Sequence, residues 1–346
     1  MKNPVIFGAA APLDLFPRFC YDYSVRTAKG EKAVAQKDVN PYPFSDTNKR
    51  YQTFDFYTRA VFGGKCARIP LDAGFSCPNK DGTRGTGGCI FCLRGSSSNR
   101  GTLSEQYEEA RRVALRKWRL SGFIPYLQAN TNTYAPPEVL RSVYEKAAAL
   151  PGAVMLAVAT RADCLSDGVI GEIVRISKKI PVTVELGLQT SNDLTAERIN
   201  RCHSFAEFRD GYGRLRAAGG DISIGFHIIN GLPGETREDM IQTARDAASL
   251  FPDMMKIHLL HVLRDTPLAD AYEKGEYVPM EKEEYVSIVC DQLELLPPDC
   301  VIARLSGEAP EDVLLAPAWC RRKIAVMNDV DKELYRRDSW QGKYFK

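Results

Sequence analysis

Apolar runs of strand length recur along the chain from Lys65 onward and alternate with segments of helical period. This pattern gives six candidate strands, at residues 66–73, 123–129, 153–160, 181–189, 222–229 and 254–262. Strands that alternate with helices are typical of βα units, in which the strands run parallel. The pattern therefore predicts an α/β fold built on one parallel sheet.

The segments between these strands carry signals for the start of a helix. An apolar stripe follows Ser104, and Pro137 stands where a first helical turn tolerates proline, so we expect helices to begin at both places. Two further starts have the spacing of a capping box, Ser204 with Glu207 and Thr236 with Asp239.

Two of the strands have one apolar and one polar face. The polar face of 181–189 would carry Thr183, Glu185, Gly187 and Gln189, and that of 222–229 would carry Ser223, Gly225 and His227. A half-solvated sheet is one explanation. Helices normally cover both faces of a parallel sheet, however, so we favour a curved sheet whose polar face lines a ligand cavity.

The two ends of the chain differ from its middle. Residues 1–45 show no sustained period and run into a turn-rich Asn-Pro-Tyr-Pro stretch, so we expect a poorly ordered N-terminal extension. Residues 46–282 would form the core, a partial (β/α)6 barrel of the TIM type. Residues 283–346 would form a C-terminal cap over the open side of the barrel.

Composition limits the partners that the sequence suggests. The chain has 346 residues, 44% hydrophobic content and a net charge of +2, which suits an enzyme-sized core and selects neither nucleic acid nor an anionic membrane. Ten cysteines are too sparse for a small disulfide scaffold. Pro12 and Asp14 interrupt the only signal-like stretch, and no apolar run could span a bilayer. We expect a cytoplasmic protein with no membrane partner; the oligomeric state stays open.

The most specific chemical signal is a cysteine trio after the first strand. Cys77, Cys89 and Cys92 have the spacing C-x11-C-x2-C in a glycine-rich loop. Three thiolates can hold an iron-sulfur cubane and leave one iron open to another ligand, as catalysis requires. The alternative is a zinc site with Cys66 as fourth thiolate, but Cys66 begins the first strand and would lie at the opposite end from the loop.

With this motif the chain resembles a radical S-adenosylmethionine (SAM) enzyme of the YhcC-like bacterial group, similar in its core to the Elongator catalytic subunit. The resemblance runs through residues 71–82, 87–92, 129–134, 159–163, 185–190, 199–203, 231–235 and 314–320. It implies that the trio binds a [4Fe-4S] cluster, that SAM binds the open iron, and that an electron from a flavodoxin- or ferredoxin-type partner releases a 5′-deoxyadenosyl radical. The protein would bind and orient the cofactor and the substrate, and it would exclude water from the site.

The resemblance also implies a set of cofactor contacts. Phe91 would lie near the adenine, and the segment that contains Gln128 and Asn130 would lie near the methionine part, although the family's Gly-Gly-Glu is absent there. Thr160 and Arg161 follow the third strand. Polar groups at the carboxyl ends of parallel strands are where such folds bind ligands.

Further cofactor contacts are expected later in the chain. Glu185 and Gln189 would end the fourth strand, and we favour these two as cofactor contacts. Arg201 stands in Arg-Cys-His, where the family has Arg-Gly-His; it would pair with the cofactor carboxylate or simply lie at a helix end. Gly231 would present its backbone to the adenine or cap a helix.

Three residues are candidates for catalysis on the substrate. His227 and His258 would face the cavity, unless they are ordinary core histidines. Cys320, in Ala-Pro-Ala-Trp-Cys, is a candidate donor of a hydrogen atom or an electron.

The resemblance to the Elongator subunit suggests transfer RNA as substrate, with modification of the side chain of the wobble uridine. Basic runs at 111–119, 321–323 and 336–337 are compatible with phosphate contacts, although such runs are usually solvated faces. The alternatives are a radical SAM enzyme for a small metabolite, and a non-catalytic zinc or iron-sulfur protein that binds nucleic acid or senses redox state. The polar face of the barrel argues against a mere scaffold.

Overall fold

The computed structural model describes residues 49–93, 101–307, 309 and 311–346. The chain divides into two units, and all described residues belong to the second, Asn40–Lys346. The predicted N-terminal extension, 1–45, therefore lies outside the described residues. Within the described part, no helix is long and apolar enough to cross a membrane.

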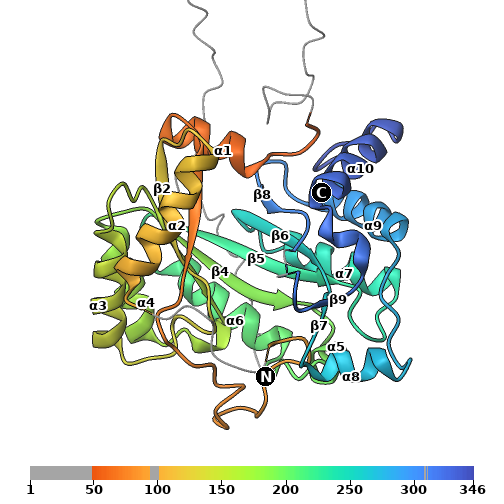
Figure 1. Cartoon of the computed structure of the whole chain (residues 1–346), viewed down its shortest axis with the longest axis horizontal. Helices are drawn as coiled ribbons and strands as arrows, with labels where there is room; N and C mark the ends of the chain where they lie inside the picture. The colour runs from red at the N-terminus through yellow and green to blue at the C-terminus, as the bar shows by residue number, and fades with distance from the viewer. Residues whose placement is uncertain (1–48, 94–100, 308, 310) are drawn as a thin grey trace, which may run out of the picture. The chain divides into compact units, whose positions relative to one another are not determined.

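Seven parallel strands form the main sheet, which curls into a half-barrel (Figure 1). In spatial order they are β1 (Cys66–Leu71), β2 (Gly122–Leu127), β3 (Leu156–Thr160), β4 (Val182–Gln189), β5 (Ile222–Asn230), β6 (Met254–Leu259) and β8 (Val301–Arg304). The predicted partial α/β barrel is confirmed, and its six predicted strands are β1 to β6. The seventh strand is a correction, because segment 283–346 was expected to form only a cap.

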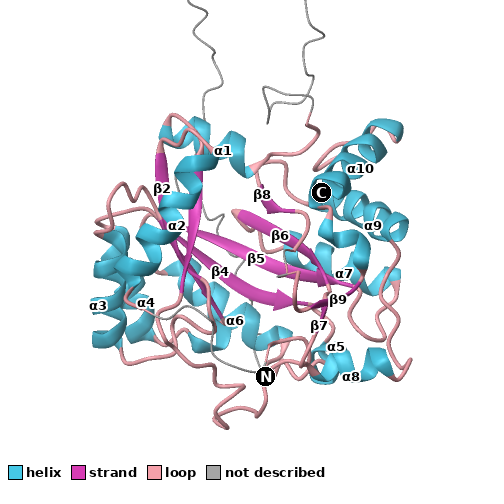
Figure 2. Ribbon diagram, viewed as in Figure 1, coloured by secondary structure: helices cyan, strands magenta, loops and turns pink. Residues whose placement is uncertain are grey.

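Helices connect and flank these strands, as Figure 2 shows. They are α1 (Phe54–Phe62), α2 (Leu103–Lys117), α3 (Pro137–Ala148), α4 (Asp167–Ser177), α5 (Asp193–Arg198), α6 (Phe205–Ala217), α7 (Arg237–Ala248), α8 (Pro267–Glu273), α9 (Lys282–Leu295) and α10 (Lys323–Arg336). Two short 3-10 helices are η1 (Ala162–Cys164) and η2 (Ala318–Arg321). A separate antiparallel pair consists of β7 (Val262–Leu263) and β9 (Leu314–Ala316).

Local sequence signals set most of the helix starts. Pro137 is the first residue of α3, and both predicted capping boxes are present, at the starts of α6 and α7. The predicted start at Ser104 was wrong. Thr102 is the N-cap of α2 and forms its own capping box with Glu105, three residues further on, which satisfies backbone N–H groups that Ser104 could not reach.

The two faces of the sheet have different surroundings. Val184, Leu186 and Leu188 of β4 are fully buried in the main hydrophobic core, on the side of the flanking helices. The opposite face of β4, which includes Glu185, points into the half-barrel and meets charged side chains from other strands. The alternation in the sequence thus separates the core from a polar interior.

The first described residues run beside the last strand of the sheet. The backbone N–H of Ile302 in β8 donates to the carbonyl of Gln52 at 2.8 Å, and Thr53 forms a parallel bridge with the same residue. Helix α1 follows directly and contacts both β8 and β1. The two outer strands of the half-barrel are therefore joined by the same short segment.

Candidate active site

The cysteine loop, residues 77–92, leaves the carboxyl end of β1 and is held in shape by its own backbone. Lys80 N–H donates to the Cys77 carbonyl at 2.8 Å, and Cys92 N–H donates to the Cys89 carbonyl at 2.9 Å. Gly88 has φ of 78°, a left-handed conformation that glycine adopts without strain. The loop therefore turns back on itself and carries all three cysteines.

The three thiols are free and partly buried, and two of them influence each other. A hydrogen bond from Cys89 lowers the pKa of Cys92 to about 7, and the positive charges of Lys80 and Arg161 act in the same direction. The same pairing raises the pKa of Cys89. Because a thiolate is the form that binds iron, this environment favours metal binding at Cys92.

The residues fit a cluster better than a single ion. Among the described residues, no three His, Cys, Asp or Glu side chains converge on one metal ion. A cubane does not need this convergence, because each thiolate binds a different iron. Cys66, the fourth ligand of the zinc alternative, starts β1 at the far end of the strand, where it packs against Ile124 and Tyr126.

Two residues that follow α5, Ile199 and Asn200, tie the cysteine loop to the barrel. The Asn200 amide donates to the Gly88 carbonyl at 2.7 Å, and Ile90 N–H donates to the Ile199 carbonyl at 3.1 Å. Asn79 Nδ2 lies 3.6 Å from the Cys89 sulfur, which it can reach as a weak donor. Phe91 is partly buried against a second apolar cluster beside this loop.

Two predicted cofactor arginines already use their donors within the protein. Arg161 donates to Asp163 and, through Nη1, to the Arg201 carbonyl at 2.8 Å. Arg201 is buried and donates to the backbone carbonyls of Leu188, Thr190 and His203. Both arginines therefore hold neighbouring backbone and side chains in place, and their role as cofactor contacts stays a prediction.

The departure from the family motif at Cys202 has a structural counterpart. Cys202 has φ of 59°, in the left-handed region, which explains why glycine suits this position. Its sulfur also lies against Gly85 of the cysteine loop, so closely that a side chain at Gly85 would collide with it.

Five of the other predicted cofactor residues lie at the carboxyl ends of four neighbouring strands, whereas Glu185 lies in the middle of β4 and not at the strand end expected for it. Asn130 accepts a hydrogen bond from Lys80 of the cysteine loop at 2.9 Å, and Gln128 beside it is exposed. Thr160 contacts Thr133 through its hydroxyl. The remaining two have left-handed backbone conformations, Gln189 with φ of 59° and Gly231 with φ of 83°.

Glu185 is part of a buried charge cluster in the interior of the half-barrel. Its two oxygens contact Arg68 of β1 and Lys256 of β6, and the Tyr126 hydroxyl of β2 lies 3.0 Å from the Lys256 ammonium. Burial alone would favour the neutral acid, but the charges of Arg68 and Lys256 hold the pKa of Glu185 well below its usual range. Burial lowers the pKa of Lys256 to about 8.

His227 and His258 lie beside this cluster. Their ring centroids are 3.9 Å apart, and burial lowers the pKa of His227 to about 3 and that of His258 also well below its usual value. Both are therefore neutral, and the buried Nε2 atom of each has no hydrogen-bond partner within the described part of the chain. We call the following six residues the barrel chamber: Arg68, Tyr126, Glu185, His227, Lys256 and His258.

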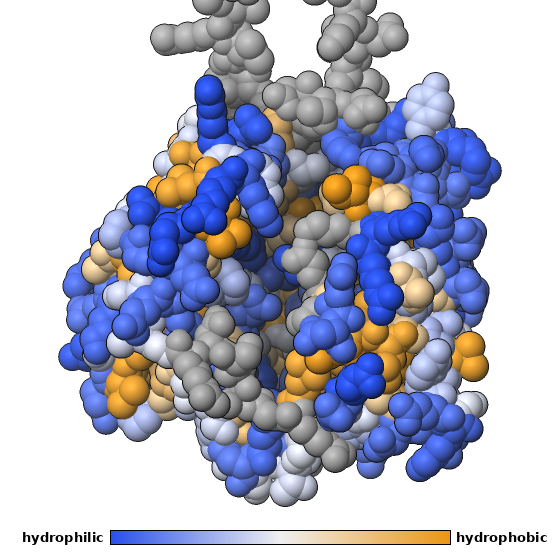
Figure 3. All heavy atoms as spheres, in the orientation of Figure 1, coloured by the Kyte–Doolittle hydropathy of each residue, from blue (hydrophilic) through white to orange (hydrophobic). Residues whose placement is uncertain are grey.

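The chamber side of the sheet is visible from outside. In the view of Figure 1 no helix lies in front of β4, β5 and β6, and Figure 3 shows this face hollowed near its centre with hydrophilic atoms at the bottom. Arg68, Tyr126 and Lys256 were not predicted as site residues. Their signal was present, because Arg68 and Lys256 are single charges within the otherwise apolar strands 66–71 and 254–259.

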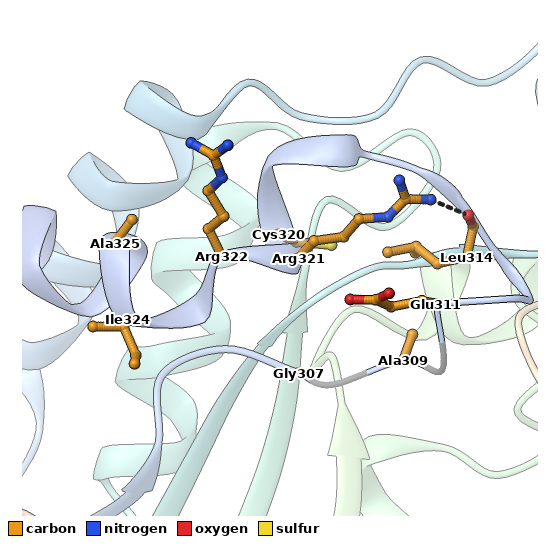
Figure 4. A pocket seen from close by; sticks show the side chains of 9 residues that line it. All are labelled: Gly307, Ala309, Glu311, Leu314, Cys320, Arg321, Arg322, Ile324 and Ala325. Atoms are coloured by element: carbon orange, nitrogen blue, oxygen red, sulfur yellow. Dashed lines mark hydrogen bonds between the residues drawn. The ribbon is translucent and has the colours of Figure 1, made fainter.

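Cys320 belongs to a separate pocket formed by η2, α10, β9 and the residues after β8. This pocket has a volume of about 580 Å³ (Figure 4). The Cys320 thiol is buried and donates to the Pro317 carbonyl at 3.0 Å, and burial raises its pKa to about 11. Arg321, which also lines the pocket, donates to the Leu314 carbonyl at 3.0 Å.

Comparison with known proteins gives a consistent assignment. Residues 81–247 match the model of the radical SAM superfamily, and residues 252–336 match that of the radical SAM C-terminal domain. The chain is 42% identical to YtqA of Bacillus subtilis over 88% of its length and 96% of that protein's, and 35% identical to YhcC of Escherichia coli over 79% and 88%. The chain belongs to the radical SAM superfamily.

Membership in the radical SAM superfamily makes the chain an enzyme whose cofactors are a [4Fe-4S] cluster and SAM. The solved structure of archaeal Elp3 from Methanocaldococcus infernus has the same fold, with a TM-score of 0.60 at 17% identity over 80% of this chain and 64% of that one. A shorter match, 26% identical over 165 residues, is to the tRNA uridine(34) acetyltransferase of Methanocaldococcus jannaschii. It covers 47% of this chain and 30% of that protein.

Proposed function

We propose that this radical SAM enzyme modifies the side chain of the wobble uridine in transfer RNA. The observation that carries the proposal is the position of a polar chamber inside a half-barrel whose strands end at the cysteine loop. One archaeal relative is a tRNA uridine(34) acetyltransferase, and this similarity supports assigning the substrate to the wobble position. Access along the open face of β4 to β6 suits a nucleotide that projects from a larger RNA.

Cys77, Cys89 and Cys92 would hold the cluster, and the positive charges of Lys80 and Arg161 would favour the thiolate form of Cys92. When bound, the cluster and SAM supply a carbon-centred radical that abstracts a hydrogen atom from the substrate. Phe91 and Gly231 would lie near the adenine of the cofactor, and Gln128 and Asn130 would lie near its methionine part. Thr160 and Gln189 would add polar contacts to the cofactor. The protein's contribution is positioning and the exclusion of water.

His227 and His258 would contact the substrate. Because burial keeps both imidazoles neutral, neither can act as a cationic acid near neutral pH, and each has one nitrogen that can donate and one that can accept. Their buried Nε2 atoms would be satisfied by a polar group of the substrate. In the same proposal, the neutral Cys320 thiol would supply a hydrogen atom late in the reaction, and a flavodoxin- or ferredoxin-type protein would supply electrons.

The test of the cluster is anaerobic reconstitution with iron and sulfide, followed by measurement of bound iron and of 5′-deoxyadenosine after reduction. Replacing Cys77, Cys89 and Cys92 by serine should abolish both. Cys66→Ser is the matched control, because Cys66 lies at the other end of β1, and it should retain both. Equal iron binding by the triple variant and the wild type would refute the assignment.

The test of the substrate uses bulk transfer RNA from a strain that lacks the gene. Incubation with reconstituted enzyme, SAM and reductant should convert one modified wobble uridine into another, detected by mass spectrometry of the nucleosides. The triple cysteine variant should leave the nucleosides unchanged. If the wild type cleaves SAM but alters no nucleoside, the RNA assignment fails and a small metabolite becomes the better substrate class.

A further inference from the structure

The barrel chamber holds more positive charge than its own carboxylate neutralises. Arg68 and Lys256 contact the same acid, Glu185, and the three side chains are 16%, 9% and 6% exposed. A single carboxylate balances one of these two cations. Burial of an uncompensated charge costs several kcal/mol, so the arrangement is expensive unless something else supplies negative charge.

The chamber also contains hydrogen-bonding atoms that nothing in the described chain satisfies. The buried Nε atom of Arg68 has no acceptor, and the buried Nε2 atoms of His227 and His258 have no partner. A polar cluster built only for stability normally pairs such atoms, because each unpaired one costs about 1–3 kcal/mol. Unsatisfied atoms beside excess charge are typical of a binding site whose ligand is polar.

The neighbouring strand strengthens the positive potential. Arg304 of β8 lies close enough to Lys256 and His258 for its charge to disfavour the protonated form of both. Lys256 is the third of the six residues of β6, below the strand end from which the cofactor-binding loops start. Apart from Glu185, which belongs to the chamber, the predicted SAM contacts lie at the strand ends, and the chamber is deeper in the half-barrel than they are.

We propose that the barrel chamber binds a carboxylate of the substrate, and that Lys256 and Arg68 determine this specificity. The inference rests on the proposed function, because it specifies that the wobble-uridine side chain of the substrate carries an acidic group. The incoming carboxylate would balance the second cation and accept hydrogen bonds from Arg68 and Lys256. The neutral histidines would pair with its neighbouring polar atoms.

The experiment measures binding of fluorescent anticodon hairpins to the anaerobically reconstituted enzyme without reductant. One hairpin has a wobble uridine whose C5 side chain ends in a carboxylate, and the other has the carboxamide in its place. The wild type should bind the acid about tenfold more tightly than the amide. Lys256→Met should bring this ratio close to one, and Lys256→Arg should restore most of it. A ratio near one in the wild type, or an unchanged ratio in Lys256→Met, would overturn the inference.

Glu185→Gln provides a second test if Lys256→Met does not fold. It keeps both cations and removes the competing internal carboxylate, so the acid hairpin should bind several-fold more tightly than to the wild type; equal or weaker binding counts against the inference. Binding of SAM, measured by equilibrium dialysis, should be little changed in Lys256→Met, because Lys256 lies below the strand-end residues that are predicted to contact SAM.

Free nucleosides separate the inference from the proposed function. Uridine-5-acetic acid and its amide are compared by ligand-observed NMR with the wild type and Lys256→Met. If neither hairpin binds but the acid nucleoside binds in a Lys256-dependent way, the RNA assignment fails and the carboxylate site stands. If the acid is preferred over the amide neither as a hairpin nor as a free nucleoside, the carboxylate site is refuted, and this outcome does not depend on the RNA assignment.

Discussion

Asn200 donates its side-chain amide to the carbonyl of Gly88 at 2.7 Å, and so fastens the cysteine loop to the residues that follow α5. The same amide reaches the Thr86 carbonyl at 3.1 Å. A single side chain thereby holds two carbonyls that are two residues apart in the cysteine loop.

Replacing Asn200 by glycine should loosen the cysteine loop without backbone strain. Asn200 has φ of 55°, which glycine tolerates, so the change removes the two amide hydrogen bonds and the contact of the Cys202 thiol with the Asn200 amide oxygen at 3.2 Å without straining the backbone. We expect the reconstituted variant to lose iron to a chelator several-fold faster than the wild type. The loss is measured by the decrease in the visible absorbance of the cluster. Asp338→Gly, at another left-handed residue remote in sequence, is the control and should lose iron at the wild-type rate.

Arg201→Met should destabilise the fold. The arginine donates to three backbone carbonyls, and methionine would leave buried acceptors unpaired, at a cost of about 3 kcal/mol or more. Arg198→Met is the comparison, since Arg198 is exposed and donates to one carbonyl; its cost should stay below about 1 kcal/mol. Denaturant unfolding measures both. An unchanged unfolding free energy in Arg201→Met would favour a direct cofactor contact instead.

Gly211 and Gly213 of α6 should respond in opposite ways to alanine. A Cβ at Gly211 would lie 2.1 Å from the carbonyl oxygen of Ala162 in η1, so Gly211→Ala should push the helix from η1 and cost about 1–3 kcal/mol. A Cβ at Gly213 meets nothing within 4 Å, so Gly213→Ala should be neutral or stabilise by up to about 1 kcal/mol. Because Ala162 separates Arg161 from Asp163, only Gly211→Ala should also weaken SAM binding.

Glu235→Gln should stabilise the protein at neutral pH and not at acid pH. Burial raises the pKa of Glu235 from 4.5 to about 7, so the folded state keeps its proton where the unfolded state has lost it. As pH rises through this window, the wild type loses stability relative to the variant, by an amount on the order of 1–3 kcal/mol above the upper pKa. Thermal melts of both proteins from pH 5 to pH 8 would show a growing difference; a constant difference contradicts the burial of the carboxylate.

The sequence predicted the sheet well because its strands obey a simple rule. Each of the first six strands is an apolar run bounded by turns, and even the polar face of β4 was visible as an alternation around Glu185. The strand β8 escaped because Val301–Arg304 has only four residues and ends in a charge. Such a short segment is a strand because it pairs with β6, and the local sequence pattern does not show this pairing.

The site was predictable where chemistry is local and obscure where it depends on distant strands. Cys77, Cys89 and Cys92 share one loop, so their spacing was informative. The partners of Glu185 come from β1 and β6, and only folding brings Arg68 and Lys256 to the same carboxylate. Arg201 is a different case. Its position in the motif suggested a cofactor contact, but in the fold its guanidinium donates to backbone carbonyls.

The pairing of Gln52 with Ile302 has a further consequence for solubility. An unpaired outer strand is a template for other chains, and here the residues before α1 cover part of that boundary. Removing the residues before α1 would expose the edge of β8, and removing β8 would expose the edge of β6. Either exposed edge could pair with another chain. Fragments trimmed to the barrel strands should therefore precipitate during expression, although Cys77, Cys89 and Cys92 would still be present in them.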